Sequence, residues 1–384
     1  MKLLSETQSA GYVLCILLAI LFVVCVPVSA ADWSNGRANS QGTGATEDAL
    51  PEDLSLLWEY ELKGLGFDAS PIIADGKVFA NDHDGRIVAL DLATGKELWK
   101  RELDTGFIAS PAYRDGVLFA ADYDGVIYAL NGTTGKEVWT FESEGGEING
   151  SPVFHKDSVL FTADSGTLFR LQCKDGSLVW KYETNEPILC GASLTANVTF
   201  LGGCDEHLHV VDLEKGTRIG DPVSVGATQS TPCVVGDRVM LPSHTGHIYQ
   251  FEVAESNELT KKWEFRDDSV ANEFRNSLAV KDGLAVGTSS SKRVFAIDIE
   301  TGEVKWTKIL RKRADASPII AGDSVIAAAA DGRLIRFDLQ TGEETWMFEA
   351  KPQFAASPAA SDGKLVAANL RGTIYCFGSK SAAP

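Results

Sequence analysis

The 384-residue chain is poor in basic residues and in long apolar runs, and each shortage excludes a class of protein. Lys and Arg number 35 against 53 Asp and Glu, so the formal net charge is −18. Nucleic acids are bound by clustered basic side chains, and the only dense basic group is Lys308 with residues 311–313. We therefore expect no nucleic-acid partner. Beyond residue 28, no apolar stretch is long enough to cross a bilayer.

The usual signatures of metal and nucleophile chemistry are also missing. The sequence has no Cys-x-x-Cys, His-Glu-x-x-His or Gly-x-Ser-x-Gly pattern. The Asp-x-Asp-Gly fragments at 82–85 and 122–125 lack the glutamate that completes an EF-hand loop. Five cysteines follow the first thirty residues: Cys173, Cys190, Cys204, Cys233 and Cys376. The number is odd, so at least one thiol is free or pairs between chains, and spacing does not specify a disulfide.

The first thirty residues are typical of an export signal. Residues 12–28 are apolar and are followed by small residues, which predicts a signal peptide cleaved after Ala30. The preceding segment carries one Lys and one Glu, so a retained anchor in the inner membrane stays an alternative. In both cases we expect export to the periplasm or cell envelope. Neither cysteine of this segment follows the small residues of a lipoprotein signal.

A repeat of about forty residues organises the remainder of the chain. Seven tryptophans are separated by 41, 40, 41, 83, 43 and 40 residues, and 83 is two periods with one tryptophan missing near Gly220. They are Trp58, Trp99, Trp139, Trp180, Trp263, Trp306 and Trp346. We interpret them as inter-blade packing residues whose indole N–H bonds a neighbouring backbone. A Ser-Pro or related dipeptide recurs eight times, Ser193-Leu194 among them, so both spacings count eight units.

Each unit contains four short apolar runs separated by turns. In the unit that ends at Trp139, Asp-Gly dipeptides at 115–116 and 124–125 separate runs rich in β-forming residues. Four strands in each of eight units predict an all-β protein, an eight-bladed β-propeller of four-stranded antiparallel blades. Residues 56–60 form a lone strand before the first full unit, and the last unit lacks a fourth strand. We expect the N-terminal strand to close the last blade.

The expected domain organisation has four parts. Residues 1–30 are a signal peptide or anchor, 31–53 a linker, 54–378 the propeller and 379–384 a C-terminal tail. The linker assignment rests on composition, since that stretch is rich in Gly, Ser, Thr and Asn.

The turn before the tryptophan carries a recurring motif. Residues 89–99 have the sequence A-L-D-L-A-T-G-K-E-L-W, residues 296–306 have A-I-D-I-E-T-G-E-V-K-W, and 131–139 and 338–346 carry most of it. This resembles the tryptophan-docking repeat A-x-D-x-x-T-G-x-x-x-W of quinoprotein-like (PQQ-repeat) propellers, and the resemblance covers roughly residues 54–378. The family includes dehydrogenases that hold pyrroloquinoline quinone (PQQ) with calcium. It also includes non-enzymatic scaffolds such as the BamB-type factors of outer-membrane protein assembly.

The chain departs from the usual pattern of both classes. Such dehydrogenases are usually longer and many carry adjacent cysteines over the quinone, whereas no Cys-Cys dipeptide occurs here. The BamB-type factor is a lipoprotein, and this chain lacks that signal. The leading hypothesis is an exported, non-catalytic scaffold that binds envelope proteins or peptides, with no cofactor, metal or catalytic residue expected. The alternatives are a small PQQ- and calcium-dependent dehydrogenase and a propeller that binds a small ligand or carbohydrate.

Candidate binding residues lie in loops that a propeller gathers on one face, around the channel mouth. These are the loops between the second and third strands and those leading into Ser-Pro. The residues expected there are Asp82, His83, Asp122, Tyr123, Asp164, Asp205, His207, His244, Asn272, Arg275 and Arg371. Asp84 and Asp124 each precede a turn glycine, and turn chemistry accounts for them.

Two sets of these candidate residues, the carboxylates and the residues of one long loop, bear on the alternative functions. In the dehydrogenase hypothesis, carboxylates such as Asp82, Asp122 or Asp205 would hold calcium, with Arg275 near the quinone oxygens. The loop 266–276 is longer than its equivalents, and insertions in repeat folds often carry binding residues. Here Arg275 and Asn272 are candidates to bind an anionic ligand or a loop of a partner protein. His209, on a predicted third strand, is expected to face a packed surface.

Overall fold

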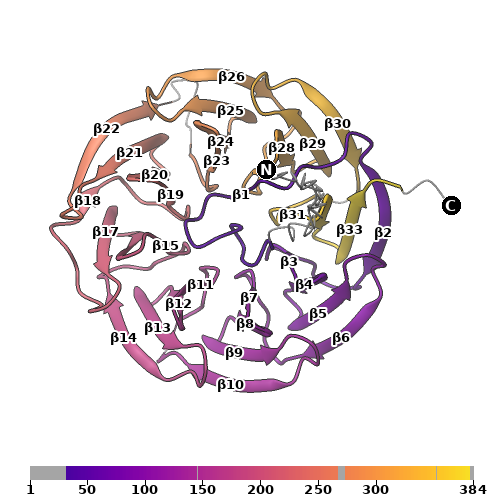
Figure 1. The fold of residues 1–384 in the computed structure, drawn as a ribbon, viewed down its shortest axis with the longest axis horizontal. Helices are drawn as coiled ribbons and strands as arrows, with labels where there is room; N and C mark the ends of the chain where they lie inside the picture. The colour runs from indigo at the N-terminus through magenta and orange to yellow at the C-terminus, as the bar shows by residue number, and fades with distance from the viewer. Residues whose placement is uncertain (1–31, 145, 267–272, 352, 381–384) are drawn as a thin grey trace, which may run out of the picture.

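Eight sheets, seven of four strands and one of five, surround a central axis in the computed structural model (Figure 1), which describes residues 32–144, 146–266, 273–351 and 353–380. Blade 1 comprises β3 (Ile72–Ala74), β4 (Lys77–Asn81), β5 (Arg86–Asp91) and β6 (Glu97–Glu102). Blade 2 comprises β7 (Ala112–Arg114), β8 (Val117–Ala121), β9 (Val126–Asn131) and β10 (Glu137–Glu142). Blade 3 comprises β11 (Val153–His155), β12 (Ser158–Ala163), β13 (Thr167–Gln172) and β14 (Leu178–Glu183). Blade 4 comprises β15 (Ser193–Leu194), β16 (Val198–Gly202), β17 (His207–Asp212) and β18 (Val223–Ser224).

The other half of the ring repeats this arrangement. Blade 5 comprises β19 (Cys233–Val235), β20 (Arg238–Pro242), β21 (His247–Val253) and β22 (Leu259–Arg266). Blade 6 comprises β23 (Ala279–Lys281), β24 (Leu284–Ser289), β25 (Arg293–Asp298) and β26 (Val304–Ile309). Blade 7 comprises β27 (Ile319–Ala321), β28 (Ser324–Ala328), β29 (Arg333–Asp338) and β30 (Glu344–Glu349), and its inner strand pairs in parallel with β1 (Ala45–Thr46). Blade 8 comprises β31 (Ala359–Ser361), β32 (Lys364–Ala368), β33 (Thr373–Gly378) and the N-terminal β2 (Ser55–Glu61).

The predicted fold class is therefore confirmed, including the closure of the last blade. Strand β2 pairs antiparallel with β33, with Tyr60 opposite Ile374. Between blade 8 and blade 1, the amide of Ser357 donates to the Ser70 hydroxyl at 3.1 Å. Within the described ranges, no helix is long and apolar enough to cross a membrane.

The tryptophans join neighbouring blades at their outer edges. The Trp99 indole Nε1 donates to the Gly132 carbonyl of the next blade at 3.0 Å. Trp58, Trp139, Trp180, Trp263 and Trp306 make the equivalent bond. Each ring also lies on the glycine of the following Thr-Gly or equivalent turn; a Cβ built on Gly135 would be 2.7 Å from the Trp99 ring. The motif thus repeats one contact between neighbouring blades at six of the eight junctions.

Blades 7 and 4 depart from this pattern. Trp346 of blade 7 contacts blade 8 through ring packing on Phe377, with centroids 5.4 Å apart, and no tryptophan is present in blade 4. Its outer strand β18 has two residues and no tryptophan, as the gap near Gly220 predicted. The repeat dipeptide of this blade is also displaced from the predicted Ser193-Leu194. Gly191 occupies the serine position, because its amide donates to Thr231 Oγ1 at 3.1 Å just as the Thr231 amide donates to Ser277 Oγ at 2.9 Å.

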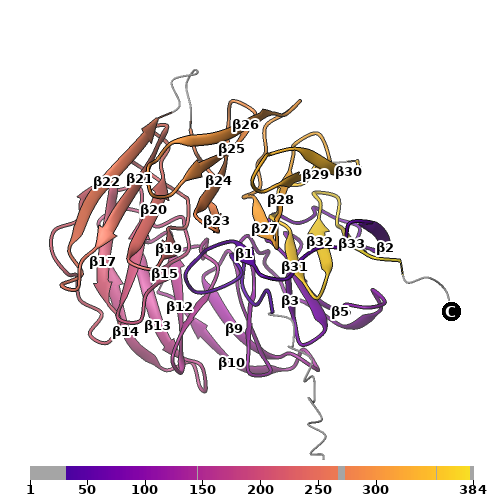
Figure 2. The ribbon, with the colours of Figure 1, turned by 45° about the horizontal axis from the view of Figure 1, so that its top comes forward.

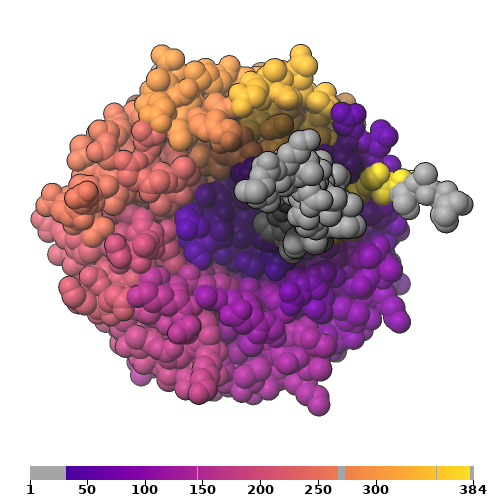
Figure 3. All heavy atoms as spheres, viewed as in Figure 1, coloured from indigo at the N-terminus to yellow at the C-terminus, as the bar shows by residue number. Residues whose placement is uncertain are grey.

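The segment assigned from composition as a linker forms part of the propeller core, which corrects that expectation. Its carbonyls accept backbone N–H groups from the innermost strands of six blades at 2.7–3.0 Å. The donor–acceptor pairs are Ile73–Trp33, Tyr113–Ser34, Leu194–Ser40, Val234–Gln41, Val280–Thr43 and Ile320–Gly44. The segment therefore runs around the inside of the ring, in the position of the indigo chain in Figures 1 and 2, and indigo atoms fill the central hollow in Figure 3.

A buried arginine lies at the centre of this plug, which we define as residues 33–48. The Arg37 side chain donates to the carbonyls of Leu278 (2.6 Å) and Pro318 (3.3 Å). Burial lowers the pKa of its guanidinium to about 10. A cavity of about 10 Å³ lies beside Arg37, Ser151 and Gly191, roughly the room that one water needs. The central channel is thus filled by the chain itself.

Candidate functional site on the mouth face

The loops between second and third strands are held at one end of the blades by a hydrogen bond that recurs in all eight. In each blade, the amide of the first or second residue of this loop donates to a carbonyl of the loop that leads into the first strand of the same blade, at 2.8–3.4 Å. The donors are His83, Tyr123, Asp164, Cys204, His244, Ser290, Ala330 and Leu370, which we call the mouth ring. The acceptors are Gly66, Gly106, Glu147, Pro187, Ala227, Glu273, Arg313 and Gln353. One backbone frame therefore presents eight positions with diverse side chains.

Four predicted site residues belong to the mouth ring: His83, Tyr123, Asp164 and His244. Arg275 follows the ring acceptor Glu273 and is exposed at the same face. Arg371 is exposed next to the ring residue Leu370. Asn272 lies outside the described residues.

Asp82 and Asp122 do not open onto the mouth. Both are buried, and one carboxylate oxygen of each accepts the amides two and four residues later, at 2.9–3.0 Å. The other oxygen accepts from Arg86 Nε at 2.7 Å for Asp82 and from the Tyr128 hydroxyl at 2.8 Å for Asp122. Burial raises the pKa of the Asp122 carboxyl, against the lowering effect of these bonds. Turn chemistry, which the sequence analysis gave to Asp84 and Asp124, is thus carried by the residues two positions earlier.

Asp205 and His207 border a separate cavity between blades 3 and 4. Asp205 Oδ2 lies 2.6 Å from His209 Nε2, and His209 Nδ1 lies 2.9 Å from the Tyr182 hydroxyl. His209 is buried, as expected for a packed position. The cavity, of about 590 Å³, is lined by Tyr182, His207, His209 and the neighbouring loop residues. It lies where blade 4 has only its short outer strand β18.

A cluster on the blade 1 side of the mouth includes a residue that the sequence analysis missed. His83 Nε2 lies 2.9 Å from Asp68 Oδ2, and its Nδ1 lies 2.5 Å from the Tyr123 hydroxyl. The His83 and Tyr123 rings are stacked at 6.0 Å with an interplanar angle of 7°. Burial raises the pKa of the Tyr123 hydroxyl, and the charges of Glu147 and Asp68 add to the shift. The sequence could have pointed to Asp68, because this residue lies two positions before Ser70, in the loop that leads into the first strand of blade 1.

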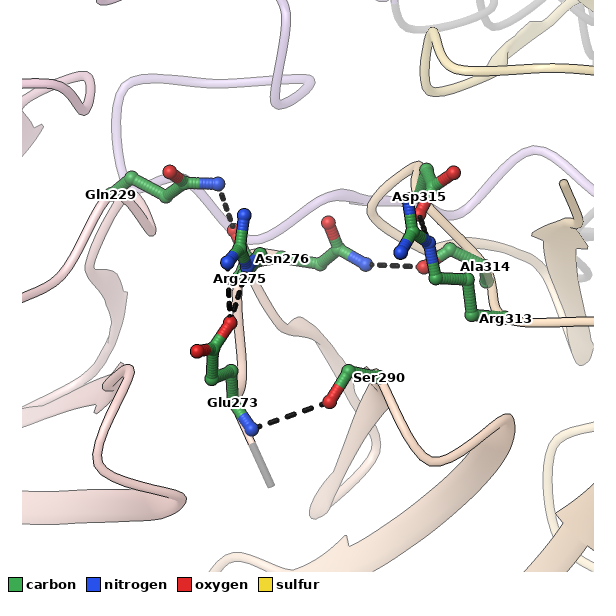
Figure 4. Close-up of a pocket in the computed structure, with 8 residues that line it drawn as sticks. All are labelled: Gln229, Glu273, Arg275, Asn276, Ser290, Arg313, Ala314 and Asp315. Carbon is green, nitrogen blue, oxygen red and sulfur yellow. Dashed lines mark hydrogen bonds and ion pairs between the residues drawn. The ribbon is translucent and has the colours of Figure 1, made fainter. Parts of the chain in front are cut away.

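A second pocket opens on the mouth face between blades 5 and 7 (Figure 4). It encloses about 290 Å³ and is lined by Gln229, Glu273, Arg275, Asn276, Ser290, Arg313, Ala314 and Asp315. Arg275 Nε donates to Glu273 at 2.6 Å, and Arg313 Nε donates to Asp315 at 2.5 Å. Asn276 is fixed by its bond to the Ala314 carbonyl at 2.9 Å. We call this the arginine pocket.

The carboxylates proposed as calcium ligands do not fit that role. Asp82, Asp122 and Asp205 each have their oxygens committed to side-chain and backbone donors of their own blade. Throughout the described part of the chain, no three His, Cys, Asp or Glu side chains converge as metal ligands. All five cysteines in that part are free thiols, and burial raises the pKa of Cys190 and Cys233 to about 12.

His244 is expected to make stability dependent on pH. Burial and, secondarily, the charge of Arg275 lower its imidazole pKa below 6.5, and its Nε2 is buried without a hydrogen-bond partner in the described structure. Between the folded pKa and 6.5 the unfolded state binds more protons, so this contribution to stability is lost as pH falls below about 6.5. The urea midpoint of His244→Gln should therefore fall less between pH 7 and pH 5 than that of the wild type. Equal falls would contradict this, and His207→Gln is the control.

Comparison of the sequence with known proteins places the chain in a family. A family model described as outer membrane protein assembly factor BamB matches residues 51–189, 83–272 and 260–382. The chain belongs to this family. Among curated members, it is 23% identical to BamB of Nitrosomonas eutropha over 205 residues, which is 49% of this chain and 50% of that protein. It is 25% identical to BamB of Yersinia pestis over 223 residues, covering 55% and 40%. The chain thus spans about half the length of these relatives or less.

The solved structures establish the shared fold. BamB from Moraxella catarrhalis superposes with a TM-score of 0.72 at 19% identity, covering 86% of this chain and 99% of that one. The quinohemoprotein alcohol dehydrogenase from Comamonas testosteroni superposes with a TM-score of 0.76 at 14% identity, covering 92% and 82%. Since both functional classes share the propeller, the fold alone does not choose between them.

Proposed function

We propose that this BamB-family propeller is an exported, non-catalytic scaffold that binds segments of envelope proteins across its mouth face. The name of its relatives, outer membrane protein assembly factor, supports a role beside other proteins of the cell envelope. A place in the cell envelope agrees with the export signal predicted for residues 1–30.

The observation that carries the proposal is the contrast between the filled channel and the varied mouth. The plug bonds to the inner strands, and the cavity beside Arg37 is too small for a ligand, which favours recognition at the surface loops. There, a repeated backbone bond holds His, Tyr, Asp, Cys, Ser, Ala and Leu side chains at equivalent positions. A rigid frame with variable loops is the usual arrangement of a binding surface.

Site-specific photo-cross-linking tests the proposal in cells that express the full chain. A photoreactive residue at Tyr123 or Arg275 should cross-link to an envelope protein. The same residue at Leu98 or Val138, exposed on outer strands β6 and β10, should not. Equal cross-linking from both regions, or none from the mouth, would contradict the proposal.

A calorimetric titration with PQQ, with and without calcium, addresses the dehydrogenase alternative. It is followed by a dye-reduction assay with alcohols or sugars. Calcium-dependent binding with turnover would replace the scaffold proposal by an enzymatic one. The same titration with simple sugars addresses the carbohydrate alternative.

A further inference from the structure

Acidic side chains dominate one half of the mouth face. On the mouth face, the loops between second and third strands and the loops leading into the first strands of blades 2–4 contain no Lys or Arg. Besides the buried Asp122, and Asp205, which contacts His209, these loops contain seven described acidic residues that are exposed or half-buried. They are Asp104, Asp124, Glu144, Glu147, Asp164, Glu186 and Glu206, which we call the acidic half. Burial raises the pKa of the Glu147 carboxyl, and the nearby charge of Asp164 raises it further. The negative charges therefore lie close enough to interact.

Basic side chains predominate on the opposite half. The loops of blades 6–8 carry seven exposed basic residues: Arg275, Lys292, Arg311, Lys312, Arg313, Lys351 and Arg371, which we call the basic half. Glu273 pairs with Arg275, Asp315 with Arg313, and Asp331 with Arg333. Asp267 and Asp268 belong to the same loops in the sequence but lie outside the described residues. When they are included, these loops contain five acidic residues and seven basic ones.

Most of this positive charge is uncompensated. Within the described ranges, five of the seven basic side chains make no ion pair: Lys292, Arg311, Lys312, Lys351 and Arg371. In a chain of net charge −18, a basic patch on one face sets up a field across that face. Such fields orient charged partners and select them by complementarity.

The arginine pocket gives the basic half a concave site. Arg313 bonds to Asp315 through Nε, so its two Nη groups keep donors for another acceptor. Arg275 bonds to Glu273 through Nε and Nη2 and keeps Nη1. Guanidinium groups recognise carboxylates with planar, paired hydrogen bonds.

We propose that the mouth binds an extended protein segment that is itself bipolar. Its basic stretch lies over the acidic half, its acidic stretch over the basic half, and one carboxylate enters the arginine pocket. This rests on the proposed function and specifies the chemistry of the partner.

Two synthetic peptides of identical composition provide the test. In one, a lysine block and a glutamate block are separated by a neutral flexible linker; in the other, the same residues alternate. Because the two peptides have the same net charge, the general attraction of cations to an acidic protein contributes equally to both and does not affect the comparison of their affinities. By fluorescence anisotropy on the full chain at low salt, the block peptide should bind at least about tenfold more tightly, with the difference shrinking as salt is added.

Charge reversal locates the binding. Lys312→Glu combined with Arg371→Glu should remove the preference for the block peptide. The matched control, Lys96→Glu with Lys136→Glu, changes the same charge in exposed turns between third and fourth strands and should preserve it. These substitutions are all at exposed positions, so folding should be retained.

The outcomes separate the two proposals. Equal affinity for the block and alternating peptides, or no binding of either, overturns the bipolar inference. Loss of preference in the control variant overturns it as well. Mouth-specific cross-linking is unaffected by those results, whereas its absence overturns the proposed function itself.

Discussion

Replacing Trp33 by alanine is expected to lower the free energy of unfolding by about 3–5 kcal/mol, the usual cost of removing a large buried aromatic side chain. Trp33 is fully buried in a hydrophobic cluster that includes side chains of blades 1, 7 and 8 and of the plug. Its carbonyl also accepts the Ile73 amide at 3.0 Å, which fixes the start of the plug against blade 1. If residues 31–53 were a solvated linker, the same substitution would cost little.

Urea denaturation followed by circular dichroism measures this difference. Leu65→Ala is the control, because this leucine is 66% exposed in a mouth loop and its truncation should change stability by less than about 0.5 kcal/mol. A Trp33→Ala protein as stable as the control would show that the plug contributes nothing to the fold.

Gly135→Ala is expected to cost at least about 2 kcal/mol more than Gly76→Ala, from a lost hydrogen bond and lost ring packing. Both glycines have φ of +67°, so alanine meets the same backbone strain at each. A Cβ at Gly76 would meet nothing within 4 Å, whereas one at Gly135 would lie 2.7 Å from the Trp99 ring. The ring must move, which disrupts its bond to the Gly132 carbonyl.

Comparing the two variants isolates the tryptophan contact from the strain common to both. The measurement is the difference between their unfolding free energies under identical conditions. Equal destabilisation would mean that the recurring glycine serves the turn alone and that the indole adapts at no cost.

The fold was predictable because its determinants recur along the chain. Each repeat carries its own turn glycines and tryptophan, so the missing Trp near Gly220 could be located and matched to the short strand β18. The displaced dipeptide at Gly191 was not predictable, since a serine two residues later imitated the pattern. Only the bond between blades distinguishes these two registers.

The site was predictable in outline, because loop phase alone brings His83, Tyr123, Asp164 and His244 to one face. The roles of individual carboxylates were not. An aspartate that caps a turn accepts amides two and four residues later, so the capping residue is Asp82 rather than the Asp84 beside the glycine. The plug was missed because Gly- and Ser-rich composition does not reveal non-local pairing with the inner strands.

The closure of blade 8 constrains the order in which the protein can be completed. Strand β2 lies near the N-terminus, but its partner β33 comes only at the end of the chain. Ser70 and Ser357, which are bonded between blades 1 and 8, are separated by 287 residues. Such long-range contacts carry a loop-closure entropy cost and slow folding. During synthesis, an emerging chain therefore has an open ring with an unpaired strand edge, which is exposed to other chains until β33 is complete.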